Sequence, residues 1–178
     1  FIALADENDA DGDGISGKVN YVFDEVTRTT KMGKFGWKAN EPTVLQQVAA
    51  AFSGDLGISS SIFPEQNCTS PLDCDDYPNG GNPEIPDENL EKVTFYALTL
   101  SVPARRDVDD QEVLEGKQFF DQINCTACHV PKLQTGISDV ADALSNQVIR
   151  PYTDMLLHYM GEGLADNATD FLATGNEW

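Results

Sequence analysis

Apolar residues recur at helical spacing in three stretches of the chain, which predicts three helices. They run from Pro42 to Gly54, from Glu88 to Ser101 and from Asp110 to Ile123. The inward faces are expected to carry Leu45, Val48, Ala49 and Phe52 in the first, Leu90, Val93, Ala97 and Leu98 in the second, and Val113, Gly116, Phe120 and Ile123 in the third. Residues 138–147 and 151–160 are expected to form shorter helices, and residues 21–34 a hairpin.

The stretch from 59 to 87 has the composition of a loop and contains Cys68 and Cys74. A loop of that length in a compact domain is usually functional or anchored. The two cysteines are six positions apart and could close a small disulfide that anchors the loop, as an oxidising compartment permits. Two free thiols are the alternative.

The motif Cys125-Thr126-Ala127-Cys128-His129 has the C-x-x-C-H spacing of a c-type haem attachment site. The thiols of Cys125 and Cys128 would bond to the haem vinyl groups, and His129 would bind the iron as proximal ligand. A redox C-x-x-C pair has no need of the histidine. A zinc site would need two more ligands from a chain that has few cysteines and histidines left. The helix that leads into the motif is how a cytochrome c domain begins.

An acidic stretch near the start of the chain, Asp9-Ala10-Asp11-Gly12-Asp13-Gly14, has the alternation of the first half of a calcium loop. Asp9, Asp11 and Asp13 would supply the hard oxygen ligands that calcium prefers. The final bidentate glutamate is missing, because Asn20 stands in its place. The pattern therefore predicts either a structural calcium site or a solvated acidic turn.

Composition restricts the classes of partner. The 178 residues carry a formal net charge of −19, which argues against nucleic-acid binding because phosphates would be repelled. The charge could instead attract a basic electron-transfer partner. No apolar run approaches the roughly 20 residues of a membrane span. Because haem attachment through C-x-x-C-H takes place outside the bacterial cytoplasm, we expect a periplasmic or otherwise extracytoplasmic protein whose leader lies outside this sequence.

The sequence as a whole resembles the bacterial di-haem oxidoreductases. These are sometimes labelled thiol oxidoreductases and are related to di-haem cytochrome c peroxidases and to MauG. The resemblance is carried by ADENDADGDGISG, KFGWKANEPTVLQQVAAAFSGDLGI, FYALTLSVPARR, CTACHVPKLQTG and PYTDMLLHYMGEGLAD. Family members have two C-x-x-C-H motifs and this sequence has one, so it resembles a middle segment of the family. A short mono-haem relative is the alternative.

The resemblance implies a mainly α fold in two parts. Residues 1–106 would be the tail of a first haem domain, with the acidic loop and the long loop. Residues 107–178 would be a cytochrome c-like haem domain, incomplete at its end, that holds one covalent haem c.

The resemblance also implies roles for three further residues. Trp37 falls where related peroxidases have a tryptophan between two haems, although it could be an ordinary core residue. Gln47 and Asp55 fall where those enzymes have a glutamine and a glutamate beside the peroxide-binding haem. A carboxylate there could move a proton between the peroxide oxygens. The structural alternatives are an exposed helix position for Gln47 and a helix-end residue for Asp55.

The sixth iron ligand is left open by the sequence. His158 and Met160 are candidates within the chain, and Met155 is a weaker one. The resemblance instead places the distal ligand in a segment after Trp178. Two functions remain: a peroxidase-like di-haem oxidoreductase that acts on peroxide, and an electron-carrier cytochrome c without a catalytic site.

Overall fold

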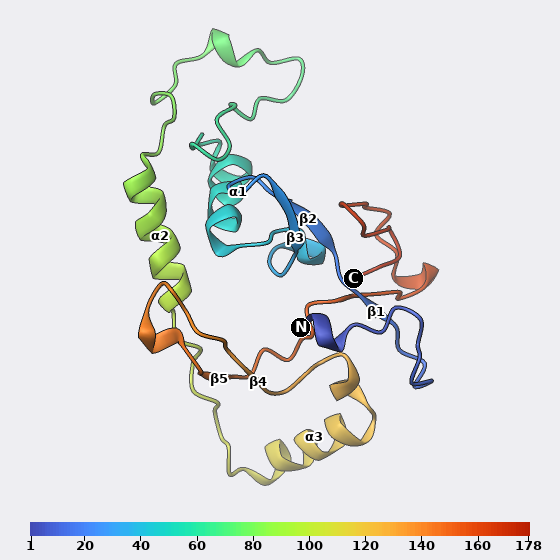
Figure 1. Ribbon diagram of the computed structural model, residues 1–178. Coiled ribbons are helices and arrows are strands. Elements are labelled where there is room, and N and C mark those ends of the chain that lie inside the picture. Colours follow the sequence, from blue (N-terminus) through green and yellow to red (C-terminus); the bar gives the residue numbers. More distant parts are fainter.

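The computed structural model describes residues 1–178, apart from the side chain of Asp75. Three α-helices are linked by long irregular segments and three small antiparallel sheets. The helices are α1 (Val44–Leu56), α2 (Asp87–Thr99) and α3 (Gln111–Gln122). The strands are β1 (Gly17–Lys18), β2 (Tyr21–Asp24), β3 (Thr29–Met32), β4 (Leu133–Gln134), β5 (Val148–Ile149) and β6 (Leu157–His158), paired as β1–β6, β2–β3 and β4–β5. Figure 1 shows α1 between α2 and the β2–β3 hairpin, with α3 at the opposite end of the molecule.

The first predicted helix is present, but its ends are set by residues other than those expected. Thr43 is the N-cap, and its hydroxyl accepts a hydrogen bond from the backbone N–H of Gln46. The helix continues through Gly54 and ends at Gly57, which has the left-handed φ of 68°. A glycine adopts that conformation without the steric cost of a Cβ atom, so Gly57 is the better C-terminal signal.

The packed core lies between α1, α2 and the start of the loop that joins them. Ala49, Ile85 and Leu90 are its buried members. Leu90 is 2% exposed, whereas Val93, expected to face inward, is 39% exposed. Thr94 is buried in its place and satisfies its hydroxyl on the carbonyl of Leu90 at 2.8 Å. Further buried apolar residues lie outside this cluster, in the strands and the C-terminal segment: Val19, Val22, Leu156, Leu157 and Ala173.

The β2–β3 hairpin confirms the prediction for residues 21–34. It is tied to α1 by the buried side chain of Gln46, which accepts from the backbone N–H of Glu25 at 2.8 Å and donates to the carbonyl of Phe23 at 3.1 Å. A buried amide that is satisfied at both ends fixes the helix against the hairpin.

The C-terminal segment returns to the N-terminal part of the chain (Figure 1). Strand β6 pairs with β1, and the fully buried side chain of Asn20 donates to the carbonyl of Lys38 and accepts from the backbone N–H of Leu172. Residues from both predicted parts, 1–106 and 107–178, therefore share one network of contacts. The division at 106 stays a prediction.

The prediction of two short helices after the haem motif is wrong. Residues 138–147 contain only a three-residue 3-10 turn, Asp142–Leu144. The hydroxyl of Ser138 accepts from the backbone N–H groups of Val140 and Ala141, and such local bonds compete with helix formation.

In residues 151–160 the backbone conformation and local hydrogen bonds oppose helix formation more strongly. Tyr152 and Met155 have left-handed φ values of 50° and 58°, and Asp154 accepts from the backbone N–H of Leu156. The segment then becomes β6 and pairs with β1. A strand partner some 140 positions away in the sequence overrides the helical spacing, which local pattern could not reveal.

The third helix agrees with its prediction, but its apolar face is largely uncovered. Asp110 caps it by accepting from the backbone N–H groups of Glu112 and Val113. Of its predicted inward residues, Gly116 and Ile123 are exposed, Val113 and Phe120 are half-buried, and no residue of α3 is fully buried. None of the helices in the described part of the chain is long and apolar enough to cross a membrane.

Candidate haem site

The C-x-x-C-H motif begins directly where α3 ends. Asn124 takes the left-handed conformation, with φ of 63°, which asparagine tolerates better than most residues. A 3-10 turn, Cys125–Ala127, follows, and the backbone N–H of His129 donates to the carbonyl of Cys125 at 2.9 Å. One turn of chain therefore carries both thiols and the imidazole of His129.

The imidazole of His129 is oriented by a backbone carbonyl. Its Nδ1 lies 2.9 Å from the oxygen of Tyr152. A carbonyl can only accept, so Nδ1 carries a proton and donates it, which leaves Nε2 as the ring nitrogen available to a metal. Metal-binding histidines commonly have their other ring nitrogen held in this way. Phe120 lies beside the ring, with centroids 5.9 Å apart.

The two thiols of the motif are free and half-buried. Burial raises the pKa of the Cys128 thiol, and the nearby carboxylates of Asp154 and Asp13 and the thiol of Cys125 raise it further. Two unpaired thiols next to a histidine whose Nε2 is free are the donor set that a haem c requires. The residues present therefore fit covalent haem.

His158 is held on both sides within the chain. Its Nε2 lies 2.8 Å from Oδ2 of Asp154, and its Nδ1 lies 3.0 Å from the carbonyl oxygen of Ser16. Both partners are acceptors, so both ring nitrogens donate and the ring is an imidazolium. In this arrangement His158 offers no lone pair to iron. Its Nδ1 is also 4.0 Å from Sγ of Cys128.

The other candidate distal ligands are less constrained. Met160 is 46% exposed, and Met155 is half-buried with a left-handed backbone. A ligand from Met160 or from a segment after Trp178 is therefore better compatible with these contacts than one from His158. The identity of the sixth ligand stays a prediction.

The hydrogen bond from His158 to Asp154 predicts a pH-dependent contribution to stability. This bond, opposed by burial, raises the pKa of His158 above its ordinary 6.5. A raised pKa means that the stabilisation is complete below the unfolded-state pKa and is lost as pH rises through the folded-state pKa. We expect the stability advantage of the wild type over His158→Gln to shrink as the pH rises above the ordinary histidine pKa of 6.5 and through the raised pKa of the folded state.

Chemical denaturation of the haem-loaded protein at several pH values measures this difference. Asp154→Asn is the control, because it removes the cause of the raised pKa and should flatten the pH dependence. An advantage that grows with pH would contradict the assignment of His158 as an imidazolium.

The structure places the side chain of Gln47 against Gly36, the residue before Trp37, and leaves Asp55 apart. Oε1 of Gln47 is buried with no hydrogen-bond partner in the structure and lies against Gly36, where an added Cβ would stand 2.7 Å from it. Trp37 is the next residue along the chain. Asp55 is exposed near the end of α1, eight residues after Gln47 and thus about 12 Å further along the helix axis.

Glu41 is a carboxyl group that the sequence reasoning missed. Burial raises its pKa, as do the charges of Asp170 and Glu25, and together they outweigh the opposing contribution of the Gln46 side chain. Its Oε2 is buried and has no hydrogen-bond partner among the side chains and backbone groups that the structure describes. A carboxyl of raised pKa is the group that general acid–base catalysis needs. In the sequence, Glu41 could have been considered as a site residue because it precedes Pro42 and lies between Trp37 and Gln47.

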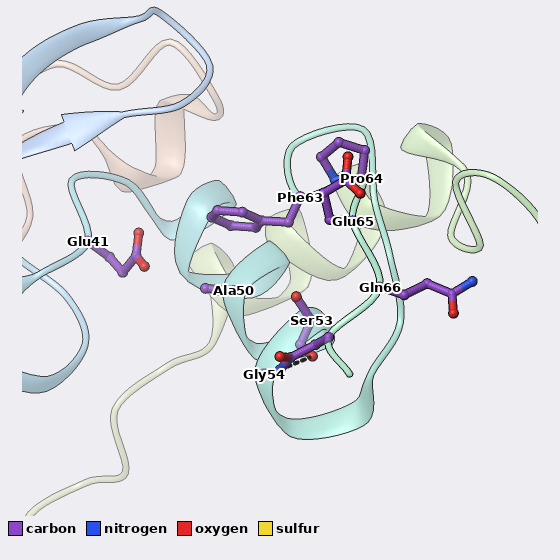
Figure 2. A pocket seen from close by; sticks show the side chains of 9 residues that line it. Glu41, Ala50, Ser53, Gly54, Phe63, Pro64, Glu65 and Gln66 are labelled. Atoms are coloured by element: carbon purple, nitrogen blue, oxygen red, sulfur yellow. Dashed lines mark hydrogen bonds between the residues drawn. The ribbon is translucent and has the colours of Figure 1, made fainter. Parts of the chain in front are cut away.

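Glu41 lies at one end of an open cavity of ≈ 460 Å³. Figure 2 shows the cavity between α1, which contributes Ala50 and Ser53, and the part of the α1–α2 loop that carries Phe63 to Gln66. The loop continues to the disulfide between Cys68 and Cys74, whose Cα atoms are 5.7 Å apart. The predicted anchor of the long loop therefore sits a few residues beyond the cavity wall.

The acidic stretch near the N-terminus gathers its three carboxylates. One oxygen each of Asp9, Asp11 and Asp13 lie within 4.8 Å of one another. The Oδ1 atoms of these residues hold the loop by accepting from the backbone N–H groups of Gly14, Asp13 and Ile15 respectively. Since Asp13 also influences Cys128, this loop lies near the haem motif.

The fold and the site define a protein with a single C-x-x-C-H motif presented at the end of a helix, with an orienting contact for its histidine. A family model described as "Di-haem oxidoreductase, putative peroxidase" matches residues 1–178. The chain belongs to this di-haem oxidoreductase family, so the resemblance stated from the sequence is confirmed and a haem redox function is implied. A search of curated proteins and a search of solved structures each found no match.

Proposed function

We propose that the chain supplies one haem c centre of a peroxidase-like di-haem oxidoreductase. The observation that carries this proposal is the set formed by Cys125, Cys128 and His129, with Nδ1 of His129 held on the carbonyl of Tyr152 at 2.9 Å. Cys125 and Cys128 would hold the porphyrin covalently, and Nε2 of His129 would bind the iron. The haem would supply one-electron redox chemistry.

The second part of the proposal concerns proton transfer near Trp37. Gln47 presents a buried, unpartnered amide oxygen, and Glu41 presents a buried carboxyl oxygen of raised pKa. Glu41 is better placed than Asp55 for this role, because one of its carboxyl oxygens is buried whereas Asp55 is exposed to water. We propose Glu41 as the general acid–base residue, with Gln47 as a positioning residue and Asp55 as the earlier candidate to be compared with it.

Peroxide turnover by the intact haem-loaded protein tests this function. Glu41→Gln is expected to lower the turnover rate about 100-fold, since general acid–base residues typically contribute that much or more. Asp55→Asn is the matched carboxylate-to-amide control and should keep most of the activity. A loss in Asp55→Asn with an unchanged Glu41→Gln would reverse the assignment. No turnover by the wild type, with a spectrum indifferent to peroxide, would favour the electron-carrier alternative.

The charge of the chain supports a basic redox partner. A net charge of −19 would raise the encounter rate with a positively charged protein, and the effect would fall with ionic strength. The disulfide between Cys68 and Cys74 together with covalent haem chemistry supports an extracytoplasmic location.

The acidic loop supports a structural calcium ion held by Asp9, Asp11 and Asp13. Calcium that binds only the folded state stabilises it by about 2.7 kcal/mol when its concentration is roughly 100 times the Kd. We expect calcium to raise the Tm of the haem-loaded wild type in a saturable way. Asp11→Asn should abolish most of that rise, because it removes one of the three clustered carboxylates.

Glu7→Gln provides the matched control for this measurement, since Glu7 is an exposed acidic residue outside the cluster. Both variants lose one negative charge. Equal losses of the calcium response in the two variants would mean diffuse attraction of calcium rather than a site.

A further inference from the structure

An asparagine–glycine pair, Asn79-Gly80, lies in the long loop between α1 and α2. Both residues are exposed, and Asn79 is the only asparagine of the chain that a glycine follows. The backbone nitrogen after an asparagine can attack the side-chain amide. A glycine at that position puts no Cβ in the way and lets the backbone reach the conformations that ring closure needs. The pair is therefore placed where this attack can occur.

The side chain of Asn79 is folded back onto the backbone. Its Oδ1 accepts a hydrogen bond from the backbone N–H of Gly81 at 3.2 Å. This bond closes a ring of atoms that contains both Cγ of Asn79 and the backbone nitrogen of Gly80, the two atoms that would react. A donor on Oδ1 also stabilises the negative charge that develops on this oxygen when a nucleophile adds to Cγ.

A carboxylate accepts the proton of the attacking nitrogen in a hydrogen bond. The backbone N–H of Gly80 donates to Oε1 of Glu84 at 2.8 Å. Hydrogen bonds from the backbone N–H groups of Gly80 and Ser59 lower the pKa of Glu84, so this group is a carboxylate at neutral pH. A base within hydrogen-bond distance of the proton that it removes has the geometry that general base catalysis requires.

Glu84 is held in turn by a residue of the interior. Ser59 is 2% exposed, and its backbone N–H and its hydroxyl donate to Oε2 of Glu84 at 2.9 and 3.3 Å. The backbone N–H of the next residue, Ile85, donates to the carbonyl of Ser59 at 3.1 Å, and Ile85 belongs to the packed core. The folded structure thus fixes the carboxylate opposite Gly80, whereas the unfolded chain lacks this arrangement.

We propose that Asn79-Gly80 is a site of spontaneous deamidation for which Glu84 acts as the general base. Glu84 takes the proton from the backbone nitrogen of Gly80, and this nitrogen forms a bond to Cγ of Asn79. The bond from Cγ to Nδ2 breaks, ammonia leaves with the transferred proton, and a cyclic succinimide remains. Water then opens the succinimide at one carbonyl to aspartate or at the other to isoaspartate.

Either product changes the loop at the point where it is tied to the core. The new carboxylate lies close to that of Glu84, and the two like charges repel each other. Isoaspartate also inserts its Cβ into the main chain, which moves the N–H of Gly80 relative to Oε1 of Glu84. The modification therefore loosens the contact between residues 79–81 and Glu84. The haem takes no part in these steps, so the inference is independent of the proposed function.

Peptide mapping by mass spectrometry tests the proposal on the haem-loaded protein kept at neutral pH, since conversion of the amide to an acid changes the mass of the peptide. We expect Asn79 to convert about 10-fold faster in the native wild type than in the guanidinium-denatured wild type, a part of the roughly 100-fold that a well-placed general base contributes in enzymes. Asn67 is an exposed asparagine of the same loop and serves as the internal control. It should convert far more slowly than Asn79, because Cys68 follows it.

Glu84→Gln should slow the native conversion about 10-fold, because an amide oxygen can accept a hydrogen bond from Gly80 but takes up no proton. Glu65→Gln is the matched control, since it removes an exposed carboxylate from the same loop, and it should leave the rate unchanged. If Glu84→Gln fails to fold, the comparison of native with denatured wild type still decides. An unchanged rate in folded Glu84→Gln, or a native wild type that converts no faster than the denatured chain, would overturn the proposal.

Discussion

Replacing both Cys125 and Cys128 with alanine is expected to reduce covalent haem from one per chain to none. The two thiols are free, half-buried and on the same turn of chain as His129, and thioether bonds to them are the only covalent link that a haem c has to the protein. Haem staining after denaturing electrophoresis, with intact mass measurement, reads the result directly.

The chain offers a matched control, because its other two cysteines form a disulfide between Cys68 and Cys74. Their double replacement by alanine also removes two sulfur atoms but should leave the haem content unchanged. The contribution of that disulfide to stability is limited to about 2 kcal/mol, since it closes a small loop. Haem retained by the Cys125/Cys128 variant, or lost equally by both, would contradict the assignment of the motif.

Lys38→Met is expected to destabilise the haem-loaded protein by about 3 kcal/mol, because it removes the fully buried cation of an ion pair with Asp166. The Lys38 side chain is fully buried, and its ammonium satisfies a carboxylate and two carbonyls of the C-terminal segment. Methionine fills a similar volume but donates no hydrogen bond, so these acceptors lose their partner. Denaturant unfolding followed by circular dichroism measures the change.

Lys92→Met is the control for this variant. Lys92 forms an ion pair with Glu88 one helical turn away, with the two side chains 66% and 78% exposed. Exposed pairs of this kind contribute only about 0.5 kcal/mol. Equal destabilisation by the two variants would mean that loss of charge, rather than burial of Lys38, governs the effect.

The Lys38 contacts explain why residues 157–178 fold back on residues 17–40. Apart from the buried Leu157 and Ala173, the C-terminal segment has little apolar burial of its own: Leu164, Phe171 and Leu172 are all more than half exposed. Its position depends on directional bonds to Lys38 and Asn20 and on pairing of β6 with β1. The attachment of this segment therefore depends on a few polar residues, which is why a single substitution is expected to have a large effect.

Local sequence signals determined the parts of the protein in which the deciding contacts are close in the chain. The three α-helices follow from apolar spacing and capping residues such as Asp110, and the β2–β3 hairpin from the apolar residues 21–23 and the polar stretch that follows them. The C-x-x-C-H motif predicted haem as the cofactor, because the chemistry of haem attachment, rather than the fold, requires this spacing. The family assignment followed from ordered motifs over the whole chain.

Tertiary structure decided what depends on partners distant in sequence. The extended path of residues 151–160 arises from pairing with β1, and the engagement of both nitrogens of His158 from Asp154 and Ser16. The burial of Lys38 beside Trp178, and the raised pKa of Glu41, likewise come from segments more than 100 residues away or from desolvation that no local pattern encodes. A sequence lists which groups can donate, accept or ionise; the fold determines which of them meet and how much water remains between them.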